Sequence, residues 1–300
     1  MMDAPREFHY RLPGRASGQR PGSHRGSSIG AGQEFVAHVS LFHRPDPRRL
    51  DLRASLRTLN EDWLVRVNRQ RAGIVVRAIV DVSASMTFGS QRPKLHVVAD
   101  FLEALGHSAF RVGDAVGMMA FDESERSDLF MPARVSRGMG SIMSSALRAT
   151  GNSASHATGR GLLAARARQN PVAGLEDAAS HIAGQQGLVF LVSDFHWALG
   201  GLNRVLDLLA HASVVPIVVW DPAETAPPER NALASLRDAE SGAWRTLWVR
   251  PKLRQDWLEG VVRRRAEINS FFASRGIQPF YIEGAFDAEA LSRYFFEAET

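Results

Sequence analysis

The chain has 300 residues, 45% of them hydrophobic and 23% charged, a balance typical of a soluble globular protein. Its 36 Lys and Arg residues exceed its 32 Asp and Glu residues only slightly, and no basic run interleaved with aromatic residues indicates nucleic-acid binding. Because the chain has no cysteine, disulfides, thiolate metal sites and cysteine nucleophiles are excluded.

Membrane insertion is not indicated by the composition. No window approaches the ~18 consecutive apolar residues of a membrane-spanning helix. The N-terminus, MMDAPREFHYRLPGR, lacks the apolar core of a signal peptide. We therefore expect a cytoplasmic protein with no membrane span, whose partners can still be membrane-associated.

The first 72 residues differ in character from the rest of the chain. Residues 1–32 are rich in Gly, Ser, Pro and Arg, which predicts a flexible or extended arm, part of which can lie against the domain. Residues 33–72 predict a small β-rich segment. In it, EFVAHVSLF (34–42) is typical of a strand, and residues 44–67 predict a turn, a short helical or extended piece and a second strand.

Residues 73–300 alternate between buried strands and amphipathic helices. Predicted strands cover 73–81, 115–121, 187–194, 214–221 and 277–284, with 128–135 returning as a hairpin partner. Predicted helices cover 94–110, 139–149, 175–184, 202–212, 253–276 and 288–298, and 236–249 predicts a hairpin or a turn and strand. This order predicts the α/β fold class, with a mostly parallel sheet covered by helices on both faces.

Three of the predicted strands end in an aspartate: Asp81, Asp194 and Asp221. In an open parallel sheet, ligands bind where the carboxyl ends of the strands meet. Ser83 and Ser85 follow Asp81 at alternate positions, and a set of donors made only of oxygen atoms suits Mg²⁺. We therefore predict Asp81, Ser83, Ser85 and Asp194 as ligands of a divalent cation, whereas Asp221, before Pro222, predicts a turn.

The alternative for Asp81, Ser83 and Ser85 is a capped turn, in which the side-chain oxygens accept backbone N–H groups. Two further features have similarly ordinary explanations. Trp197, just after the Asp194 loop, predicts a core residue rather than an exposed contact. The run Arg263–Arg265 predicts a solvated helix face rather than a phosphate site.

The acidic strand ends also carry a family resemblance. Asp81-x-Ser83-x-Ser85 resembles the first segment of the metal-ion-dependent adhesion site of von Willebrand factor A domains, and Ser193-Asp194-Phe195 resembles their distal aspartate loop. The resemblance implies a von Willebrand factor A-like domain. It also implies a metal with an open coordination position for an Asp or Glu of a partner.

The flanking residues narrow the resemblance. EF at 34, residues 44–67 and IVDVSASMTFG at 79–89 are similar to the bacterial domain-of-unknown-function family fifty-eight, and the similarity covers roughly residues 22–300. Members are often encoded beside MoxR-type AAA+ ATPases, which implies such an ATPase as the partner. The lack of preceding membrane helices resembles the MxaS-type branch, which is associated with maturation of methanol dehydrogenase.

The chain departs from these patterns at three places. The family's usual Trp after Ile-Asp is replaced by Leu52-Arg53, and its usual Gly-Asp reads RPDP at 44–47. A domains carry a metal-binding Thr, commonly in Gly-Thr-Asp-Leu, where this chain reads Ala-Gly-Leu-Glu at 173–176. The ligand set is therefore incomplete unless Thr158 substitutes through a loop that folds back.

We predict a non-enzymatic interaction module. The loops at 81–89, around 150–175 and at 194–200 would form one recognition face. With a MoxR-type ATPase, the module would mature or assemble a client protein, for example by metal insertion into methanol dehydrogenase. The alternative is a Mg-dependent hydrolase or phosphoryl-transfer enzyme that uses Asp81 and Asp194. Against it, the sequence has no G-x-S-x-G elbow, no P-loop and no base beside Ser83 or Ser85.

Overall fold

A six-stranded sheet organises the larger part of the chain. The computed structural model describes residues 7–12, 21–30, 32–58, 62–157, 172–228, 232–237 and 244–297. The strand order is β11-β8-β7-β4-β5-β6, and every neighbouring pair is parallel except β5 and β6, which form the predicted hairpin. The strands are β4 (Val75–Asp81), β5 (Ala115–Phe121), β6 (Met131–Arg134), β7 (Leu188–Ser193), β8 (Ser213–Trp220) and β11 (Phe280–Glu283).

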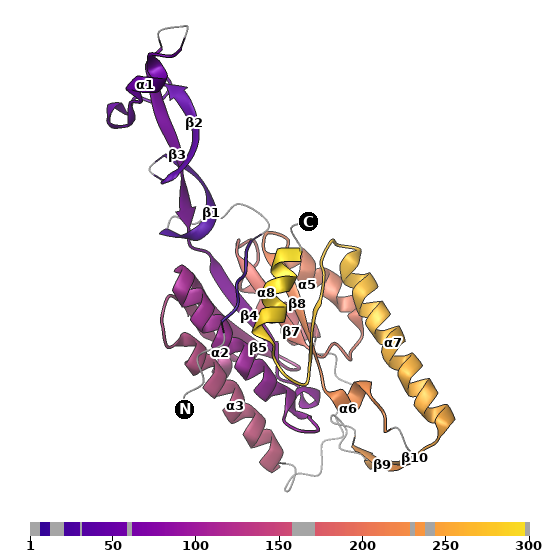
Figure 1. Ribbon diagram of the computed structural model, residues 1–300. Coiled ribbons are helices and arrows are strands. Elements are labelled where there is room, and N and C mark those ends of the chain that lie inside the picture. The colour runs from indigo at the N-terminus through magenta and orange to yellow at the C-terminus, as the bar shows by residue number, and fades with distance from the viewer. Residues whose placement is uncertain are drawn as a thin grey trace.

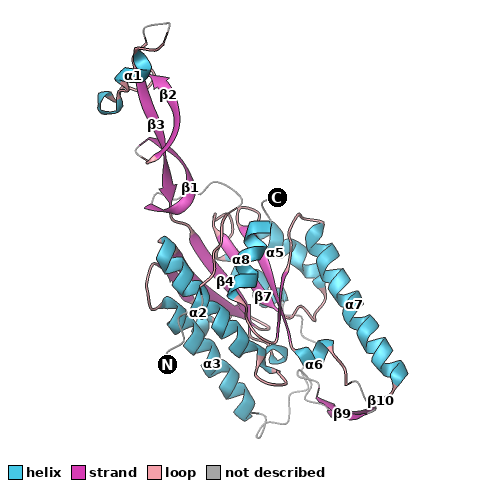
Figure 2. Cartoon of the chain, viewed as in Figure 1, coloured by secondary structure: helices cyan, strands magenta, loops and turns pink. Residues whose placement is uncertain are grey.

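Helices cover both faces of this sheet (Figure 2). One face packs against α2 (Lys94–Val112), α3 (Met139–Ala157) and α8 (Ala288–Glu297). The other face packs against α4 (Val172–Ser180), α5 (Leu202–Leu208) and α7 (Pro251–Ala273). Strands buried on both faces are expected to be apolar, as β5 is throughout and β7 is up to Ser193 at its end. The predicted α/β architecture, with helices on both faces of a mostly parallel sheet, is confirmed.

The first described residues belong to the core. Phe8 is buried among aromatic rings, with its centroid 6.0 Å from those of Phe101 and Phe286. Tyr10 is also buried, and its hydroxyl donates to Asp114 Oδ2 at 2.7 Å. Two aromatic side chains therefore hold this short segment against the domain, although the composition around it predicts flexibility.

A second, three-stranded sheet projects away from the domain (Figure 1). It consists of β1 (Pro21–Gly30), β2 (Glu34–Ser40) and β3 (Leu64–Ala72) in the order β1-β3-β2, all antiparallel. The short helix α1 (Leu52–Ser55) lies at its far end. We call the described residues between 21 and 72 the stalk. β3 runs into β4 through only Gly73 and Ile74, so the stalk is continuous with the central strand.

Within the predicted flexible or extended arm over residues 1–32, residues 21–30 are extended and form β1. The glycines that suggested flexibility let β1 approach β3 closely instead. A Cβ at Gly22 would lie 2.2 Å from the Gly73 nitrogen, and one at Gly26 would lie 2.3 Å from the Gln70 carbonyl oxygen. The main-chain ladder to β3 supplies the ordering that the composition did not predict.

The remaining elements follow β8 along the chain. α6 (Pro222–Thr225) follows β8 directly. β9 (Ala232–Arg237) and β10 (Trp244–Val249) pair in antiparallel fashion, so a hairpin is present, and its first strand begins four residues before the predicted range 236–249. Among the residues that the structure describes, none of the helices combines the length and hydrophobicity required to cross a bilayer.

Candidate functional site

The predicted acidic residues meet where the winding of the sheet reverses. From β4 the chain proceeds to β5 and β6 on one side, and it returns to the other side of β4 as β7. Asp81 ends β4 and Asp194 follows β7, so both side chains belong to the same edge of two adjacent strands. Both are fully buried, and the charge of Asp194 acts on Asp81. The predicted convergence of the two carboxylates is therefore present.

The Asp81 carboxylate is surrounded by protein donors. The Ser83 N–H donates to Oδ1 at 2.9 Å, and the Ser193 hydroxyl donates to Oδ2 at 2.7 Å. The Trp197 indole N–H lies 3.4 Å from Oδ2 and also donates to Ser193 Oγ at 3.2 Å. Burial and the nearby Asp194 charge raise the pKa of Asp81 to about 6 despite these hydrogen bonds. Trp197 is half-buried and packs against the core beside Phe195, as predicted, while its indole N–H faces Asp81.

Ser83 and Ser85 lie on the turn that follows β4. Ala84–Thr87 forms a short 3-10 helix, and the two hydroxyl oxygens are 3.2 Å apart. Ser85 also hydrogen-bonds to Asp194. The structure thus brings all four predicted residues together. It contains the capped turn as well, because Asp81 accepts the Ser83 N–H.

A buried lysine joins this group. Lys94 is the first residue of α2, and its side chain is 1% exposed. Its Nζ lies 2.8 Å from Asp194 Oδ2 and 2.8 Å from Glu224 Oε1. Burial alone would lower the pKa of Lys94 and raise that of Asp194. The charge interactions of the ion pair outweigh burial, so the pKa of Lys94 is raised and that of Asp194 is lowered.

Glu224 is held in place by the turn after β8. Asp221 caps α6, with its Oδ1 accepting the Ala223 N–H at 2.8 Å, and Glu224 Oε2 accepts the Asp221 N–H at 2.9 Å. Asp221 Oδ2 also accepts the Ser90 N–H at 2.9 Å, which ties the loop after β4 to this turn. Asp221 is therefore the turn former that the sequence predicted.

The loop after β7 is also held by α7, which packs on the other face of the sheet from α2. Phe195 is fully buried and has a φ of 49°, the only positive φ of a non-glycine residue in the part of the chain that the structure describes. Such backbone strain persists only where surrounding contacts enforce it. Arg264 donates to the carbonyl oxygens of Phe195 and Trp197. The predicted solvated face of α7 is thus wrong for Arg264, which fixes this loop.

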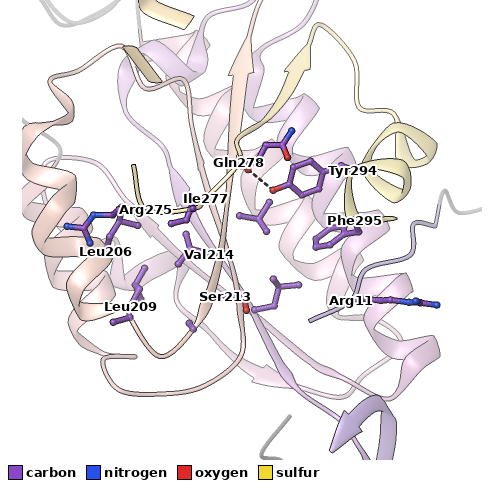
Figure 3. A pocket seen from close by; sticks show the side chains of 15 residues that line it. Arg11, Leu206, Leu209, Ser213, Val214, Arg275, Ile277, Gln278, Tyr294 and Phe295 are labelled. Carbon is purple, nitrogen blue, oxygen red and sulfur yellow. Dashed lines mark hydrogen bonds between the residues drawn. The ribbon is translucent and has the colours of Figure 1, made fainter. Parts of the chain in front are cut away.

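Two cavities of the domain differ in their distance from the acidic site. A hollow of about 370 Å³ borders Glu224 and is lined chiefly by His196, Trp220, Trp257 and Arg264. A larger cavity of about 680 Å³ includes Leu188 and Ser213, at the starts of β7 and β8, so it lies at the opposite edge of the sheet (Figure 3). The larger cavity therefore does not coincide with the acidic site.

The sequence also matches a known family. The family described as "Protein of unknown function DUF58" matches residues 45–267, which is well over half of the chain. The chain belongs to the DUF58 family. The resemblance inferred from the motifs is therefore confirmed.

Individual relatives of this DUF58 protein are distant. An uncharacterized protein of Mycobacterium tuberculosis is 26% identical over 88% of this chain and 79% of its own length. An uncharacterized protein in the moxR 3' region of Paracoccus denitrificans is 30% identical over 32% of this chain and 90% of its own length. The solved structure of an aerotolerance-related membrane protein from Bacteroides fragilis covers 76% of this chain and 98% of its own, at 15% identity and a TM-score of 0.42.

The carboxylates of Asp81 and Asp194 in this DUF58 protein already have partners within the chain. The Asp194 charge is already balanced by Lys94, and both Asp81 oxygens accept hydrogen bonds from the protein. Among the described residues, no three His, Cys, Asp or Glu side chains are placed to hold a metal ion, so a cation here would need the hydroxyls of Ser83 and Ser85 as ligands. Residues 173–176 lie in α4, and Thr158 is outside the described residues. Metal ligation by the four predicted residues therefore stays a prediction.

Sequence analysis missed Lys94 and Glu224. One signal was available for Lys94: a cation at the N-terminus of a helix is disfavoured by the helix dipole, so a lysine directly after Pro93 calls for nearby carboxylates. Glu224 had a weaker signal, since Asp221-Pro-Ala-Glu224 has the spacing of a capping box. Neither signal indicates that the two side chains meet.

Proposed function

We propose that this DUF58 protein is a non-enzymatic adaptor that works with a MoxR-type AAA+ ATPase in the maturation or assembly of another protein complex. The observation that carries the proposal is the far end of the stalk, which exposes large apolar side chains. Exposed apolar clusters of this kind are typical of surfaces that bind another molecule. The relative in the moxR 3' region supports the ATPase as that partner.

The stalk tip consists of Phe42, Leu52, Leu56 and Trp63, all exposed. Phe42 is 84% exposed and Leu56 is 86% exposed. Main-chain bonds hold the two loops of the tip side by side: Leu41 N–H donates to the Trp63 carbonyl at 2.7 Å, and Asp51 N–H donates to the Leu64 carbonyl at 2.8 Å. The apolar side chains are therefore presented on an ordered surface.

Charge distribution favours an acidic partner for the tip. Residues 21–72 contain nine arginines and five acidic residues, whereas residues 73–300 contain 23 basic and 25 acidic residues. The stalk thus carries a positive excess that the domain does not share. Among its arginines, Arg44, Arg48, Arg53 and Arg57 are exposed close to the apolar side chains. Complementary charge accelerates association and selects the partner.

The loops at the carboxyl edge of the sheet provide a second surface, which we assign to the client protein. Phe88 and His196 are exposed on the loops after β4 and β7. The hollow lined by Trp220 and Trp257 lies beside them and could receive an apolar side chain. Methanol dehydrogenase is the client that we would test first.

Direct binding to the purified MoxR-type ATPase of the same organism tests the proposal. Biolayer interferometry with the full chain should detect binding in at least one of the ATP, ADP and nucleotide-free states. The double substitution Phe42→Ser and Leu56→Ser should weaken this binding at least about tenfold, because hot-spot side chains carry most interface energy. The matched control is Ile142→Ser on α3, which removes a side chain that is 56% exposed outside the stalk.

Two results would count against the proposal. One is no binding by the wild type in any nucleotide state. The other is equal weakening by Ile142→Ser and by the stalk-tip variant, since it would show that the tip has no specific role.

Charge reversal by Arg53→Glu and Arg57→Glu should slow association, mainly at low salt.

A further inference from the structure

We propose that the ammonium group of Lys94 is the resident cation of the carboxyl-edge site and that the protein requires no divalent metal there. The proposal goes beyond the adaptor function, which could be correct with either kind of cation. It starts from the ion pairs that Lys94 makes with Asp194 and Glu224, each at 2.8 Å.

The burial of Lys94 indicates that these ion pairs are required. A lysine that is 1% exposed loses almost all hydration of its charge, which is costly unless carboxylates face it closely. Lys94 also begins α2, where the helix dipole further disfavours a cation. Asp194 is fully buried and needs a positive partner for the same reason. Each member of the ion pair therefore offsets the burial of the other.

The position of the ammonium group gives it a structural role. Lys94 comes from the start of α2, Asp194 from the end of β7 and Glu224 from α6, so a single cation connects three separate elements. A bound metal ion could connect elements at a sheet edge in the same way. Because this cation is covalently attached, the loops at the edge should keep their arrangement at any concentration of divalent ions.

Asp81 does not require a metal either. Its oxygens accept the Ser83 N–H and the Ser193 hydroxyl, with the Trp197 indole nearby. The Ser85 side chain hydrogen-bonds to Asp194, and its hydroxyl oxygen lies 3.2 Å from that of Ser83. The oxygens predicted to coordinate a metal are thus occupied by contacts within the protein.

The wild-type protein itself provides the first test. Its melting temperature should change by less than about 1 °C between EDTA and millimolar MgCl₂ or MnCl₂. A cation at about 100 times its Kd would raise the melting temperature by roughly 5 °C or more. Protein loaded with Mn²⁺ and then desalted should retain no stoichiometric manganese by electron paramagnetic resonance. A clear rise in melting temperature that disappears in Asp81→Ala would overturn the proposal.

Substitution of Lys94 provides the second test. Lys94→Met keeps much of the side-chain volume but removes the charge, and it should lower the melting temperature by roughly 6–15 °C. The matched control is Arg92→Met, which removes a neighbouring basic residue whose ion pair with Asp100 is only partly buried. That control should cost only about 1–2 °C. Equal melting temperatures for Lys94→Met and wild type would contradict the proposal.

A double substitution separates loss of charge balance from loss of packing. Adding Asp194→Asn to Lys94→Met removes the carboxylate that was left unpaired, so part of the lost melting temperature should return. Purely additive losses would show that Lys94 does not act through its charge, and the proposal would fail. The metal titration of the wild type remains decisive if Lys94→Met does not fold. ATPase binding, measured separately, tests the adaptor function and not this inference.

Discussion

Two buried carboxylate clusters lie at opposite edges of the sheet, and they are built differently. At the carboxyl edge, Asp194 is balanced by the charge of Lys94. At the other edge, fully buried Asp114 accepts the Ile74 N–H at 2.9 Å, the Tyr10 hydroxyl at 2.7 Å and a hydrogen bond with His24 Nε2 at 2.8 Å. The first cluster connects loops of the domain, whereas the second fastens the N-terminal segment and the stalk to it.

The difference shows how a buried carboxylate can be stabilised. A charged lysine balances Asp194 electrostatically, and the loss of one member of the pair leaves the other buried without its main partner. Asp114 depends on several hydrogen-bond donors from distant parts of the chain, each of which contributes less. The first cluster should therefore be more sensitive to the loss of a single side chain.

The largest effect is expected for Asp194→Ala. This substitution leaves the Lys94 ammonium buried with Glu224 alone, so the free energy of unfolding should fall by about 3–5 kcal/mol. Urea denaturation at pH 7 measures it. A loss smaller than that of Asp114→Ala would reverse the ranking of the two clusters.

A somewhat smaller effect is expected for Asp114→Ala. The substitution leaves the Tyr10 hydroxyl, the His24 ring and the Ile74 N–H without their acceptor, which should cost about 3 kcal/mol. Hydrogen exchange should accelerate in residues 7–12 and 21–30 while α4 and α5 stay protected. Asp122→Ala is the control, because Asp122 serves a partly exposed turn and should cost less than about 1 kcal/mol. Unchanged exchange in both N-terminal segments would show that Asp114 does not fasten them.

A pH series distinguishes the contribution of Asp81 to the free energy of unfolding from the contributions of Asp194 and Glu224. Because the folded pKa of Asp81 is raised to about 6, the native state binds more protons than the unfolded state between about pH 4 and pH 6. The wild type should therefore lose stability relative to Asp81→Asn as the pH rises through this window, by about 3 kcal/mol in total. Asp194 and Glu224 have lowered pKa values, so their contribution has the opposite sign and is lost as the pH falls below about 4. Parallel stability curves for the two proteins between pH 4 and pH 7 would refute the assignment to Asp81.

The smallest effect on stability is expected at the stalk tip. Phe42→Ser combined with Leu56→Ser should change the free energy of unfolding by less than about 0.5 kcal/mol, since both side chains are exposed. The same variant should lose ATPase binding. A stability loss above about 1 kcal/mol would mean that the tip is part of the folded core and not a docking surface.

The two clusters also differ in how much of each the sequence predicted. Asp81, Ser83 and Ser85 lie within five residues, and strand periodicity places Asp194 at the same edge of the sheet, so local patterns were sufficient. The Asp114 cluster joins residues 10, 24, 74 and 114, and no local pattern connects them. Lys94 and Glu224 show the same limit, because their contact depends on how helix ends pack after folding.

The architecture was predictable for a related reason. Buried apolar runs such as β5 and β7 differ clearly from amphipathic helices such as α2, so the order of elements defines a parallel sheet. β1 was not predicted, because its small residues pack on the main chain of β3 and leave no hydrophobic period. Composition identifies segments that bury large side chains, and it is uninformative about segments held by backbone pairing.

The short junction between β3 and β4 has a mechanical consequence. Only two residues separate the stalk from β4, the strand that ends at Asp81. A force applied to the stalk by another protein would therefore act directly on the central strands of the sheet. β4 is flanked by parallel neighbours on both sides, β5 and β7. Tension along β4 would therefore load the hydrogen bonds to both neighbouring strands together, in shear.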